Sequence, residues 1–338
     1  MRNIARLSTI DRSDIFADTA LKMGVNEGII EKDFWVCWAL DVLFTDNEWK
    51  EQLNFKGGTS LSKAYGLIDR FSEDIDLILD WRLLGYGLEE PWAQRSNSAQ
   101  DRFIQEANIR LAQFIADVFV PKATTLFKEV LGTEVELVAD GNNVIFKYPH
   151  AFDTAYIRPE VVLEMGTMAA WVPWEMREIH SFAAGIRPEL FSKPWTLVRT
   201  VKSERTFWEK ATILHQEAHR SSKKPMPSRY SRHYYDLYKM ANSPIRSSAL
   251  NQLGLLKDVV KFKSRFYRCP WAKYEDALCG ELKLLPPDYH LAALRKDYGA
   301  MRTIIFGNAP ELDVMLKNLQ DLEYIVNELI RNNNEASL

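Results

Sequence analysis

The chain has 338 residues, 46% of them hydrophobic and 26% charged, and its formal net charge is −3. This balance is typical of a globular protein with one large domain or two ordinary ones, and it excludes an intrinsically disordered chain. A net charge so close to zero excludes a global positive field that would attract nucleic acid, so any RNA or DNA must be held by a local patch.

The composition also indicates a cytoplasmic protein. No segment approaches the roughly 18 uninterrupted apolar residues that a membrane-spanning helix needs, and the chain turns polar soon after its start. We therefore expect no signal peptide and no membrane partner. The cysteines fit neither a disulfide framework nor a zinc-ligand spacing; they are Cys37, Cys269 and Cys279.

The first half of the chain mixes predicted helices and strands. Residues 26–44 predict a helix, because Asn26 suits its N-cap and apolar side chains recur at helical spacing. Residues 53–56 predict a short strand, a pair of glycines follows as a turn, and residues 59–65 resume a helical pattern. Residues 72–79 alternate between polar and apolar side chains and predict a second strand.

Longer elements follow. Residues 99–131 predict one long helix. Strands at residues 134–138 and 144–148 flank a glycine-containing turn and predict a hairpin, and residues 160–165 predict another strand. From about residue 195 the pattern is almost wholly helical, with helices predicted at residues 199–220, 230–241, 249–265, 289–298 and 310–332.

This order of elements predicts an α/β (α+β) fold, because strands with helices come first and helices alone come later. Proline and glycine residues near positions 185–195 indicate a domain boundary. We predict an α/β domain with a mixed sheet and N-terminal helices at residues 1–190. A helical C-terminal domain is predicted at residues 191–338.

Gly57, Gly58, Thr59 and Ser60 form the first candidate site. Two glycines let the backbone approach a ligand closely, and the helix that follows points unpaired N–H groups and its positive dipole end at the turn. This is an anion site suited to triphosphate oxygens, to which the two hydroxyls add donors. An ordinary strand–turn–helix corner would use the same residues for backbone geometry and helix capping.

Asp74 and Asp76 form the second candidate site. Alternation in the predicted strand places both on one face, and the apolar side chains of Ile75, Leu77 and Leu79 on the other. Two carboxylates so close repel each other unless a cation lies between them, and their hard oxygen atoms suit Mg²⁺. Such an ion neutralises phosphate charge and activates an attacking oxygen. The alternative is the solvent-facing polar edge of a half-buried strand.

Five blocks of the sequence, in order, carry a resemblance. They are Glu31-Lys-Asp-Phe-Trp35, Lys56-Gly-Gly-Thr-Ser-Leu-Ser-Lys63, Arg70-Phe-Ser-Glu-Asp-Ile-Asp-Leu77, Arg205-Thr-Phe-Trp-Glu-Lys-Ala-Thr-Ile-Leu-His215 and Ser231-Arg-His-Tyr-Tyr-Asp-Leu-Tyr238. The glycine turn followed by the paired aspartates resembles the nucleotidyltransferase superfamily with the DNA polymerase β-like fold. The whole series is similar to one of its families, the AbiEii toxins of type IV toxin–antitoxin and abortive-infection systems.

The resemblance implies a polymerase β-like domain that uses a nucleoside triphosphate (NTP) with Mg²⁺ or Mn²⁺. The glycine turn would grip the triphosphate, and Asp74 and Asp76 would hold the metal. A third carboxylate on a neighbouring strand usually completes the metal site, and Glu164 is the candidate for it. Glu160 competes with Glu164, because the strand predicted at residues 160–165 places both on one face.

The resemblance also implies roles for residues outside these two sites. Lys210 matches a lysine expected to contact the nucleotide phosphates, and Asp236 matches an acid expected to face the active site. Lys63 and Arg70 also belong to the nucleotide-binding set, whereas Ser72 either joins that set or hydrogen-bonds the strand entrance. Without the resemblance, Lys210 would be interpreted as a solvated helix residue, and Asp236 as the partner of a lysine three positions further along its helix.

Three further features allow two interpretations each. A basic patch with interleaved tyrosines either clamps a phosphate backbone and stacks a base or forms a solvated linker. Its residues are Arg220, Lys223, Lys224, Arg229, Arg232, Tyr230, Tyr234 and Tyr235. The Glu31-Lys-Asp33 motif either lies near the pocket or forms surface pairs. His215 and His219 have a helical spacing that suits a metal, but no third ligand is evident.

We therefore expect a nucleotidyltransferase toxin that transfers a nucleoside monophosphate from an NTP to an acceptor hydroxyl and releases pyrophosphate. The resemblance makes the 3′ end of tRNA the expected acceptor and an antitoxin from an adjacent gene the expected partner. A small molecule or a protein side chain is the alternative acceptor. A module that binds nucleotide or a partner protein without catalysis is the alternative function.

Overall fold

The computed structural model describes residues 1–45, 47–153, 157–167 and 172–335. It divides into two compact units. The first comprises Met1–Tyr65 and Phe71–Val201, and the second comprises Gly66–Arg70 and Lys202–Leu338. The boundary predicted at residue 190 precedes this division, because the sequence pattern does not reveal the strand that ends at Val201.

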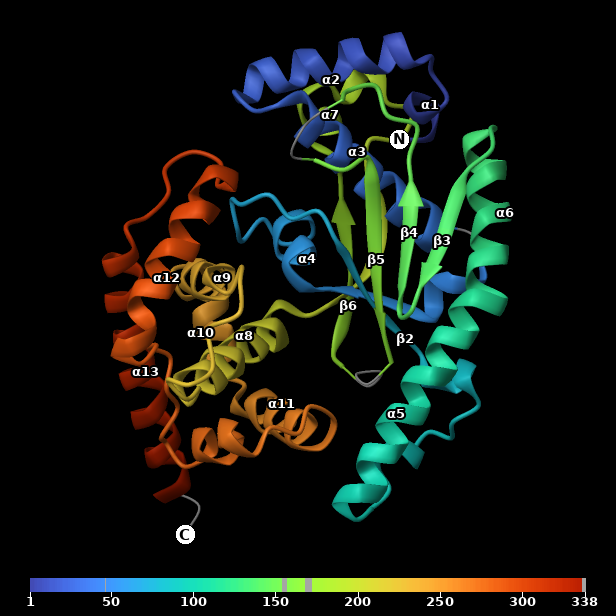
Figure 1. Ribbon diagram of the computed structural model, residues 1–338. Coiled ribbons are helices and arrows are strands. Elements are labelled where there is room, and N and C mark those ends of the chain that lie inside the picture. The colour runs from blue at the N-terminus through green and yellow to red at the C-terminus, as the bar shows by residue number, and fades with distance from the viewer. Residues whose placement is uncertain (46, 154–156, 168–171, 336–338) are drawn as a thin grey trace. The chain divides into compact units, whose positions relative to one another are not determined.

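A mixed seven-stranded sheet forms the centre of the first unit, in the order β3-β4-β5-β2-β1-β7-β6 (Figure 1). Its strands are β1 (Leu53–Lys56), β2 (Ile75–Leu79), β3 (Glu136–Asp140), β4 (Asn143–Lys147), β5 (Glu160–Gly166), β6 (Trp174–Ile179) and β7 (Thr196–Val201). Strands β2 and β5 are parallel, as are β1 and β7, and all other neighbours are antiparallel. The predicted α/β class with a mixed sheet is confirmed.

Helix α3 (Glu27–Phe44) packs on one face of the sheet. Asn26 caps it as predicted, since its side chain accepts a hydrogen bond from the Gly28 N–H at 2.9 Å. Almost every side chain of α3 is buried, and its Trp38 ring stacks on Phe146 of β4. The face that α3 covers carries the buried side chains predicted by strand alternation, among them Leu53, Phe55, Ile75, Leu77, Leu79 and Leu163.

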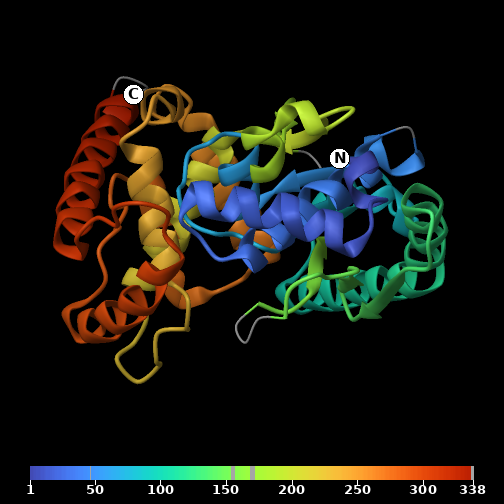
Figure 2. The same ribbon diagram turned by 90° about the horizontal axis from the view of Figure 1, so that it is seen from above.

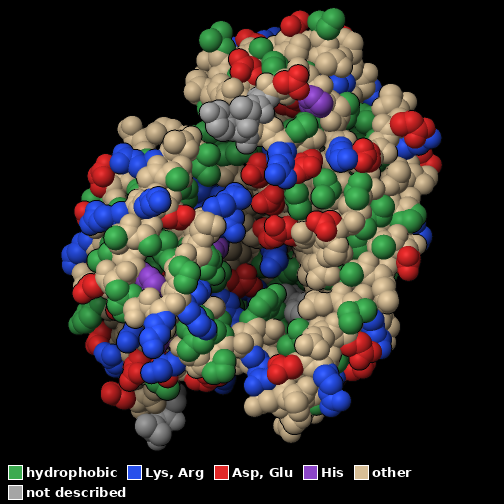
Figure 3. Space-filling model, in the orientation of Figure 1, with side chains coloured by type: hydrophobic (Ala, Val, Ile, Leu, Met, Phe, Trp, Pro, Cys, Tyr) green, Lys and Arg blue, Asp and Glu red, His purple; other side chains and the backbone are tan. Residues whose placement is uncertain are grey.

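The opposite face of the sheet, here called the polar face, carries the side chains that alternate with this core. They include Asn54, Lys56, Asp76, Ile78, Glu164, Arg199, Met176 and Trp174. In Figure 3, acidic side chains gather over β5 on this side of the first unit. The sequence therefore predicts correctly that Asp76 lies on the face opposite the core of β2.

The long helix predicted at residues 99–131 consists of three consecutive parts. They are α5 (Asn97–Phe114), a π-helical turn (Ile115–Phe119) and α6 (Val120–Leu131). Pro121 lacks the N–H that would continue the α-helical hydrogen bonds, which accounts for the π turn directly before it. The predicted hairpin is confirmed, because Asp140 of β3 pairs with Asn143 of β4 across a two-residue turn.

Two strands are absent from the prediction. The helix predicted from residue 199 begins at Ser203, and β7 lies directly before it, with β6 as its antiparallel neighbour at the sheet edge. In β7 the buried Thr196 and Val198 alternate with the exposed Leu197, which is the period of a strand. Because β7 runs almost directly into the next helix, its short alternation merges with the helical pattern.

The remaining helices complete the two units. The first unit also contains α1 (Arg2–Ala5), α2 (Thr9–Met23), α4 (Gly57–Lys63) and α7 (Phe182–Ile186). The second unit is helical, with α8 (Ser203–Ala218), α9 (Ser231–Ala241), α10 (Ile245–Leu250), α11 (Leu253–Phe266), α12 (Asp288–Met301) and α13 (Leu312–Glu335). Helix α13 lies at the edge of this unit and packs against α9 (Figure 2). None of the described helices is long and apolar enough to cross a bilayer.

Candidate functional site

The turn between β1 and α4 is built around Gly57, whose φ is +78°. A Cβ atom at this position would overlap Oδ2 of Asp76, so the carboxylate of β2 lies directly against the turn. The strand register agrees, because Lys56 and Asp76 are Cα partners in the β1–β2 pair. Only glycine meets both the backbone and the space requirement. The glycine turn and Asp76 therefore form one site.

The two hydroxyls after the glycines have partners inside the protein. Thr59 Oγ1 lies 2.5 Å from the Asp74 carbonyl oxygen and 2.9 Å from Ser72 Oγ. Ser60 Oγ donates to the Gly57 carbonyl at 2.9 Å. Thr59 and Ser60 are both buried, so their hydroxyls hold the turn and the strand entrance in place. The donors that this turn presents to an anion are the N–H groups of the first turn of α4.

The strand register distinguishes between the two candidates for a third carboxylate. Asp76 and Glu164 are Cα partners in the parallel β2–β5 pair, so their side chains lie next to each other on the polar face. Glu160 is the first residue of β5 and instead has Lys147 as its Cα partner in β4. Asp74 is predicted to lie within the strand, but it directly precedes β2, which begins at Ile75.

These carboxylates fit a hard divalent cation as a partial ligand set. Within the described residues, no group of three or more His, Cys, Asp or Glu side chains converges as a metal site. Asp76 and Glu164 lie on neighbouring strands, which are about 4.8 Å apart. Mg²⁺ binds through one or two carboxylates and takes its other ligands from water and substrate phosphates. The donor set thus suits an ion that arrives with a polyphosphate.

The ammonium group of Lys63 lies inside the first unit. It forms an ion pair with Asp33 of α3, and its Nζ atom lies 3.5 Å from the centroid of the Phe182 ring. Asp33 also accepts a hydrogen bond from the Phe182 N–H at 2.7 Å. Burial raises the pKa of Asp33, although Lys63 acts in the opposite direction. The structure therefore gives Lys63 a buried carboxylate as its partner.

The other charged residues of the Glu31-Lys-Asp33 motif are buried as well. Glu31 accepts hydrogen bonds from the N–H groups of Ala151 and Phe152, at 2.7 and 3.2 Å. Lys32 Nζ lies 2.6 Å from Glu73, the residue before Asp74. Surface pairs are therefore the wrong interpretation of this motif. It ties α3 to the segment that leads into β2, and through Asp33 to the end of α4.

Asp236 lies at the centre of a buried charge cluster in the second unit. Arg70 donates through Nε and Nη2 to its two carboxylate oxygens, at 2.7 and 2.9 Å, and Lys210 Nζ lies 2.8 Å from Oδ2. Burial alone would raise the pKa of Asp236, but the two cations outweigh burial and hold this pKa well below its usual range. Burial lowers the pKa of Lys210, whose Nζ also lies 3.2 Å from His233 Nδ1.

The contacts in this cluster rule out the alternative interpretations of Lys210 and Asp236. Lys210 is only 7% exposed, so it is not a solvated helix residue. Lys239 pairs with Asp69 at 2.7 Å, which removes it as the partner of Asp236. Arg70 is a partner of Asp236 that the sequence does not reveal. The roles of Lys210, Asp236 and Arg70 toward a nucleotide stay predictions from the family resemblance.

The predicted basic patch divides into groups with different surroundings. Arg220 forms an ion pair with the buried Glu217 at 2.7 Å. Arg229 and Arg232 instead line a cavity of about 140 Å³ within the second unit. Two of the interleaved tyrosines are at most 1% exposed and cannot stack on a base; they are Tyr234 and Tyr235.

His215 and His219 are held by the backbone. His215 Nδ1 accepts a hydrogen bond from the Lys283 N–H at 3.0 Å, and its Nε2 lies 2.9 Å from the Lys273 carbonyl oxygen. His219 Nδ1 lies 2.8 Å from the carbonyl oxygen of His215. Burial lowers the pKa of His215 to about 4. Both rings therefore have a structural role.

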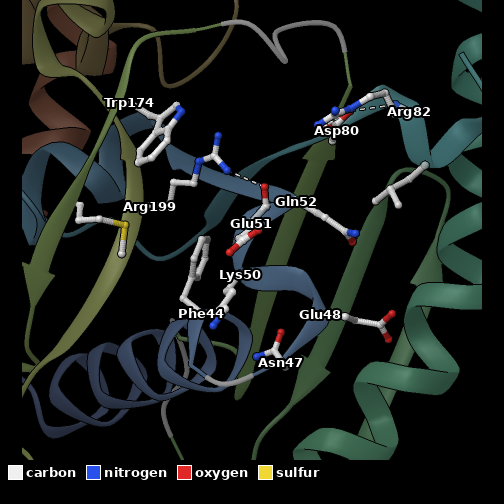
Figure 4. A pocket seen from close by; sticks show the side chains of 12 residues that line it. Phe44, Asn47, Glu48, Lys50, Glu51, Gln52, Asp80, Arg82, Trp174 and Arg199 are labelled. Atoms are coloured by element: carbon white, nitrogen blue, oxygen red, sulfur yellow. Dashed lines mark hydrogen bonds and ion pairs between the residues drawn. The ribbon is translucent and has the colours of Figure 1, made fainter. Parts of the chain in front are cut away.

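A cavity of about 970 Å³ lies at the ends of β1 and β2 away from the glycine turn (Figure 4). Trp174 of β6 and Arg199 of β7 line it side by side, and the guanidinium carbon of Arg199 lies 3.9 Å from the Trp174 ring centroid. Arg199 Nη1 donates to the Glu51 carbonyl at 2.6 Å. The sequence does not predict this cavity, because two of its walls come from the strands that the pattern hides.

Comparison with known proteins identifies the family. The model of the family described as "Nucleotidyl transferase AbiEii toxin, Type IV TA system" matches residues 38–325. A search of curated proteins gave no match. The solved structure of MenT4, nucleotidyltransferase toxin Rv2826c from Mycobacterium tuberculosis H37Rv, is similar over 96% of this chain and 98% of its own, with 17% sequence identity and a TM-score of 0.44. Because the family match covers most of its length, the chain belongs to the AbiEii family of nucleotidyltransferase toxins of type IV toxin–antitoxin systems.

Proposed function

We propose that this enzyme transfers a nucleoside monophosphate from an NTP to a hydroxyl at the 3′ end of tRNA and releases pyrophosphate. One observation carries the proposal: a Cβ atom at Gly57 would overlap the Asp76 carboxylate, so the turn proposed to bind phosphate and the side chain proposed to hold the metal adjoin. Membership of the AbiEii family supports the reaction class. The resemblance of the sequence blocks supports tRNA as the acceptor.

Each part of the site has a role in this proposal. The N–H groups of Gly58 and Thr59 in the first turn of α4 bind the triphosphate oxygens, assisted by the helix dipole. Asp76 and Glu164, with Asp74 beside them, hold Mg²⁺ or Mn²⁺, which offsets phosphate charge when it is bound. The acceptor oxygen forms a bond to the α-phosphorus, and the bond between that phosphorus and the oxygen leading to the β-phosphate breaks.

Mass spectrometry of tRNA isolated after brief expression tests the nucleotide and the acceptor together. A mass increment of one or more nucleotides at the 3′ end is the expected result. In parallel, the purified enzyme is incubated with radiolabelled NTPs and total RNA. Label that survives RNase but not protease identifies a protein acceptor, and label in neither polymer identifies a small molecule. Unmodified tRNA in growth-arrested cells would contradict the proposal.

We also propose that a protein encoded by an adjacent gene counteracts this toxin. The family belongs to type IV toxin–antitoxin systems, which supports such a partner. Co-expression of the neighbouring gene should restore growth in cells that produce the toxin. Persistent growth arrest, with both proteins detected in the cells, would argue against this partner.

Gly57→Ala is expected to weaken both the fold and the activity. The strained backbone costs about 1–3 kcal/mol of unfolding free energy. The added methyl group displaces the Asp76 carboxylate, for which we expect roughly a hundredfold loss of nucleotide transfer. Gly141→Ala is the matched control, because Gly141 has a φ of +58° but no atom within 4 Å of an added Cβ. Urea unfolding and radiolabelled transfer measure the effects, and equal loss of transfer in both variants would refute the role of the Asp76 contact.

Glu164→Gln is expected to lower nucleotide transfer at least about tenfold and to raise the Mg²⁺ concentration needed for half-maximal activity. The reason is the loss of one anionic ligand opposite Asp76. Glu160→Gln is the matched control, because Glu160 lies on the same face of β5 but opposite Lys147. If Mg²⁺ titrations of the two variants coincide, the register does not select the metal ligand.

A further inference from the structure

A second cavity, of about 260 Å³, adjoins the cavity in Figure 4 and extends it along the polar face. The two share the side chains of Trp174 and Arg199, and the second adds Asn54 of β1 and Ile78 of β2. We call the joined space the sheet cavity. It lies entirely within the first unit.

The sheet cavity reaches toward the carboxylates of the candidate site. Asn54 and Ile78 are Cα partners, and the next partners on the same face are Lys56 and Asp76. Two residues of a strand span roughly 7 Å. A molecule in the sheet cavity can therefore extend along the polar face to a group that reacts beside Asp76.

Three polar groups around this cavity have no hydrogen-bond partner in the described part of the chain. They are Oδ1 of Asn54, Oε1 of Gln52 and Nε of Arg199. Asn54 is only 6% exposed, so water from outside has little access to its amide. Buried polar groups are almost always paired. Two acceptors and one donor left unpaired around one space indicate a ligand that has both donors and acceptors.

The charges around the cavity balance, which argues against a bare phosphate as the ligand. Three cations and three anions line the larger part: Lys50, Arg82, Arg199, Glu48, Glu51 and Asp80. Arg82 is also paired with Asp80. A site for an isolated anion would instead show an excess of cations. The balance favours a neutral polar group.

The shape and chemistry of the lining suit a flat ring. Trp174 is 43% exposed and lies against the Arg199 guanidinium, which gives an aromatic and a planar cationic surface. Ile78, Val172 and Val201 form a buried apolar cluster beside them. Proteins recognise unstacked bases by stacking on aromatic or guanidinium planes and by hydrogen bonds from Asn, Gln and Arg side chains. These are the side-chain types that the sheet cavity combines.

We propose that the sheet cavity binds a nucleobase, read by the amide of Asn54 and stacked beside Trp174 and Arg199. This inference rests on the proposed function, because the base belongs either to the NTP or to the RNA acceptor. In both cases the reacting group lies beside Asp76 while its base, or that of a neighbouring nucleotide, occupies the cavity. The cavity then determines which base the enzyme selects.

Equilibrium binding to the full-length enzyme tests the inference. The first probes are the α,β-methylene analogues of the ribonucleoside triphosphates, which bind but cannot transfer. The second probes are single-stranded homopolymeric hexaribonucleotides, and tripolyphosphate serves as a probe without a base. The variants are Asn54→Leu and Trp174→Leu. Trp195→Leu is the matched control, because Trp195 is exposed directly before β7 and outside the cavity.

Asn54→Leu and Trp174→Leu should weaken binding of the base-containing probe at least about tenfold and reduce its base preference. Both variants should bind tripolyphosphate as tightly as wild-type enzyme does. The Trp195→Leu variant should bind every probe as tightly as wild-type enzyme does. If the variants bind the triphosphate analogues more weakly, the cavity belongs to the base of the NTP. If they bind the oligonucleotides more weakly, it belongs to a base of the acceptor. Asn54→Leu should unfold at the same or a higher temperature, because the change removes a buried amide oxygen that has no hydrogen-bond partner.

Failure of the inference and failure of the proposed function are distinguishable. If wild-type enzyme binds tripolyphosphate and forms product, but the variants keep its base preference, the nucleobase site is refuted and the function stands. If wild-type enzyme binds no base-containing probe, the site is refuted as well. If base binding depends on Asn54 while no acceptor is ever labelled, the nucleobase site stands and the proposed function fails.

Discussion

Asp76→Asn is expected to lower nucleotide transfer at least about a thousandfold, equivalent to roughly 4 kcal/mol of transition-state stabilisation. The amide keeps the shape of the side chain but loses the charge that holds a divalent cation. Asp76 occupies the position where this loss matters most, because it lies against Gly57 and opposite Glu164. Radiolabelled transfer measures the activity, and growth of expressing cells measures the toxicity.

The control for this substitution is Asp140→Asn, which removes an exposed carboxylate from β3 of the same sheet. Its activity should match that of wild-type enzyme. The unfolding temperature of Asp76→Asn should not fall, because the change relieves repulsion from Glu164 in the absence of metal. A folded Asp76→Asn variant that still arrests growth would remove the paired carboxylates from the reaction.

Features that depend on residues close in the chain can be predicted from the sequence. Asn26 caps its helix, and Asp140 and Asn143 close their hairpin as their local chemistry requires. The glycine turn and Asp76 belong to the same class, because one short strand, one short helix and one return strand bring them together. For this reason the sequence identifies the centre of the candidate site.

Features that depend on the order of strands in the sheet cannot be predicted from the sequence in this way. Alternation places Glu160 and Glu164 on one face, but only the parallel pairing of β2 with β5 sets Glu164 opposite Asp76. Likewise, β6 and β7 extend the polar face beyond β1, and they carry Trp174 and Arg199 of the sheet cavity. Because β6 and β7 are not evident from the sequence pattern, the cavity that they line is not evident from it either.

Buried ion pairs are a second kind of feature that cannot be predicted from the sequence. The family resemblance marks Lys63 and Arg70 as candidates for phosphate contact, and a cation near a phosphate site suits that role. Their partners come from elsewhere in the chain: Asp33 from α3, and Asp236 from a helix 166 residues after Arg70. No local spacing distinguishes a lysine that awaits an anionic substrate from one that already holds a carboxylate.

Asp236→Asn is expected to lower the free energy of unfolding of the second unit by about 3–5 kcal/mol, because it leaves two buried cations without their anion. Arg70 and Lys210 are each less than a tenth exposed, so water does not replace the lost carboxylate. Urea unfolding, followed by circular dichroism of the helical signal, measures the change. Lys239→Gln is the matched control, because it breaks the more exposed pair with Asp69 and should cost less than about 1 kcal/mol.

The dependence on pH separates the lost charge from lost packing. The pKa of Asp236 is lower in the folded protein than its ordinary 3.8, so the carboxylate contributes its full stabilisation above that value. The contribution decreases as the pH falls through the folded-state pKa, because the proton then neutralises the same group that Asn replaces. The gap in unfolding free energy between wild type and Asp236→Asn should therefore be constant near neutral pH and narrow in acid below the ordinary pKa. A gap that stays constant throughout acid titration would mean that packing, rather than the ion pairs with Arg70 and Lys210, holds this part of the helical unit together.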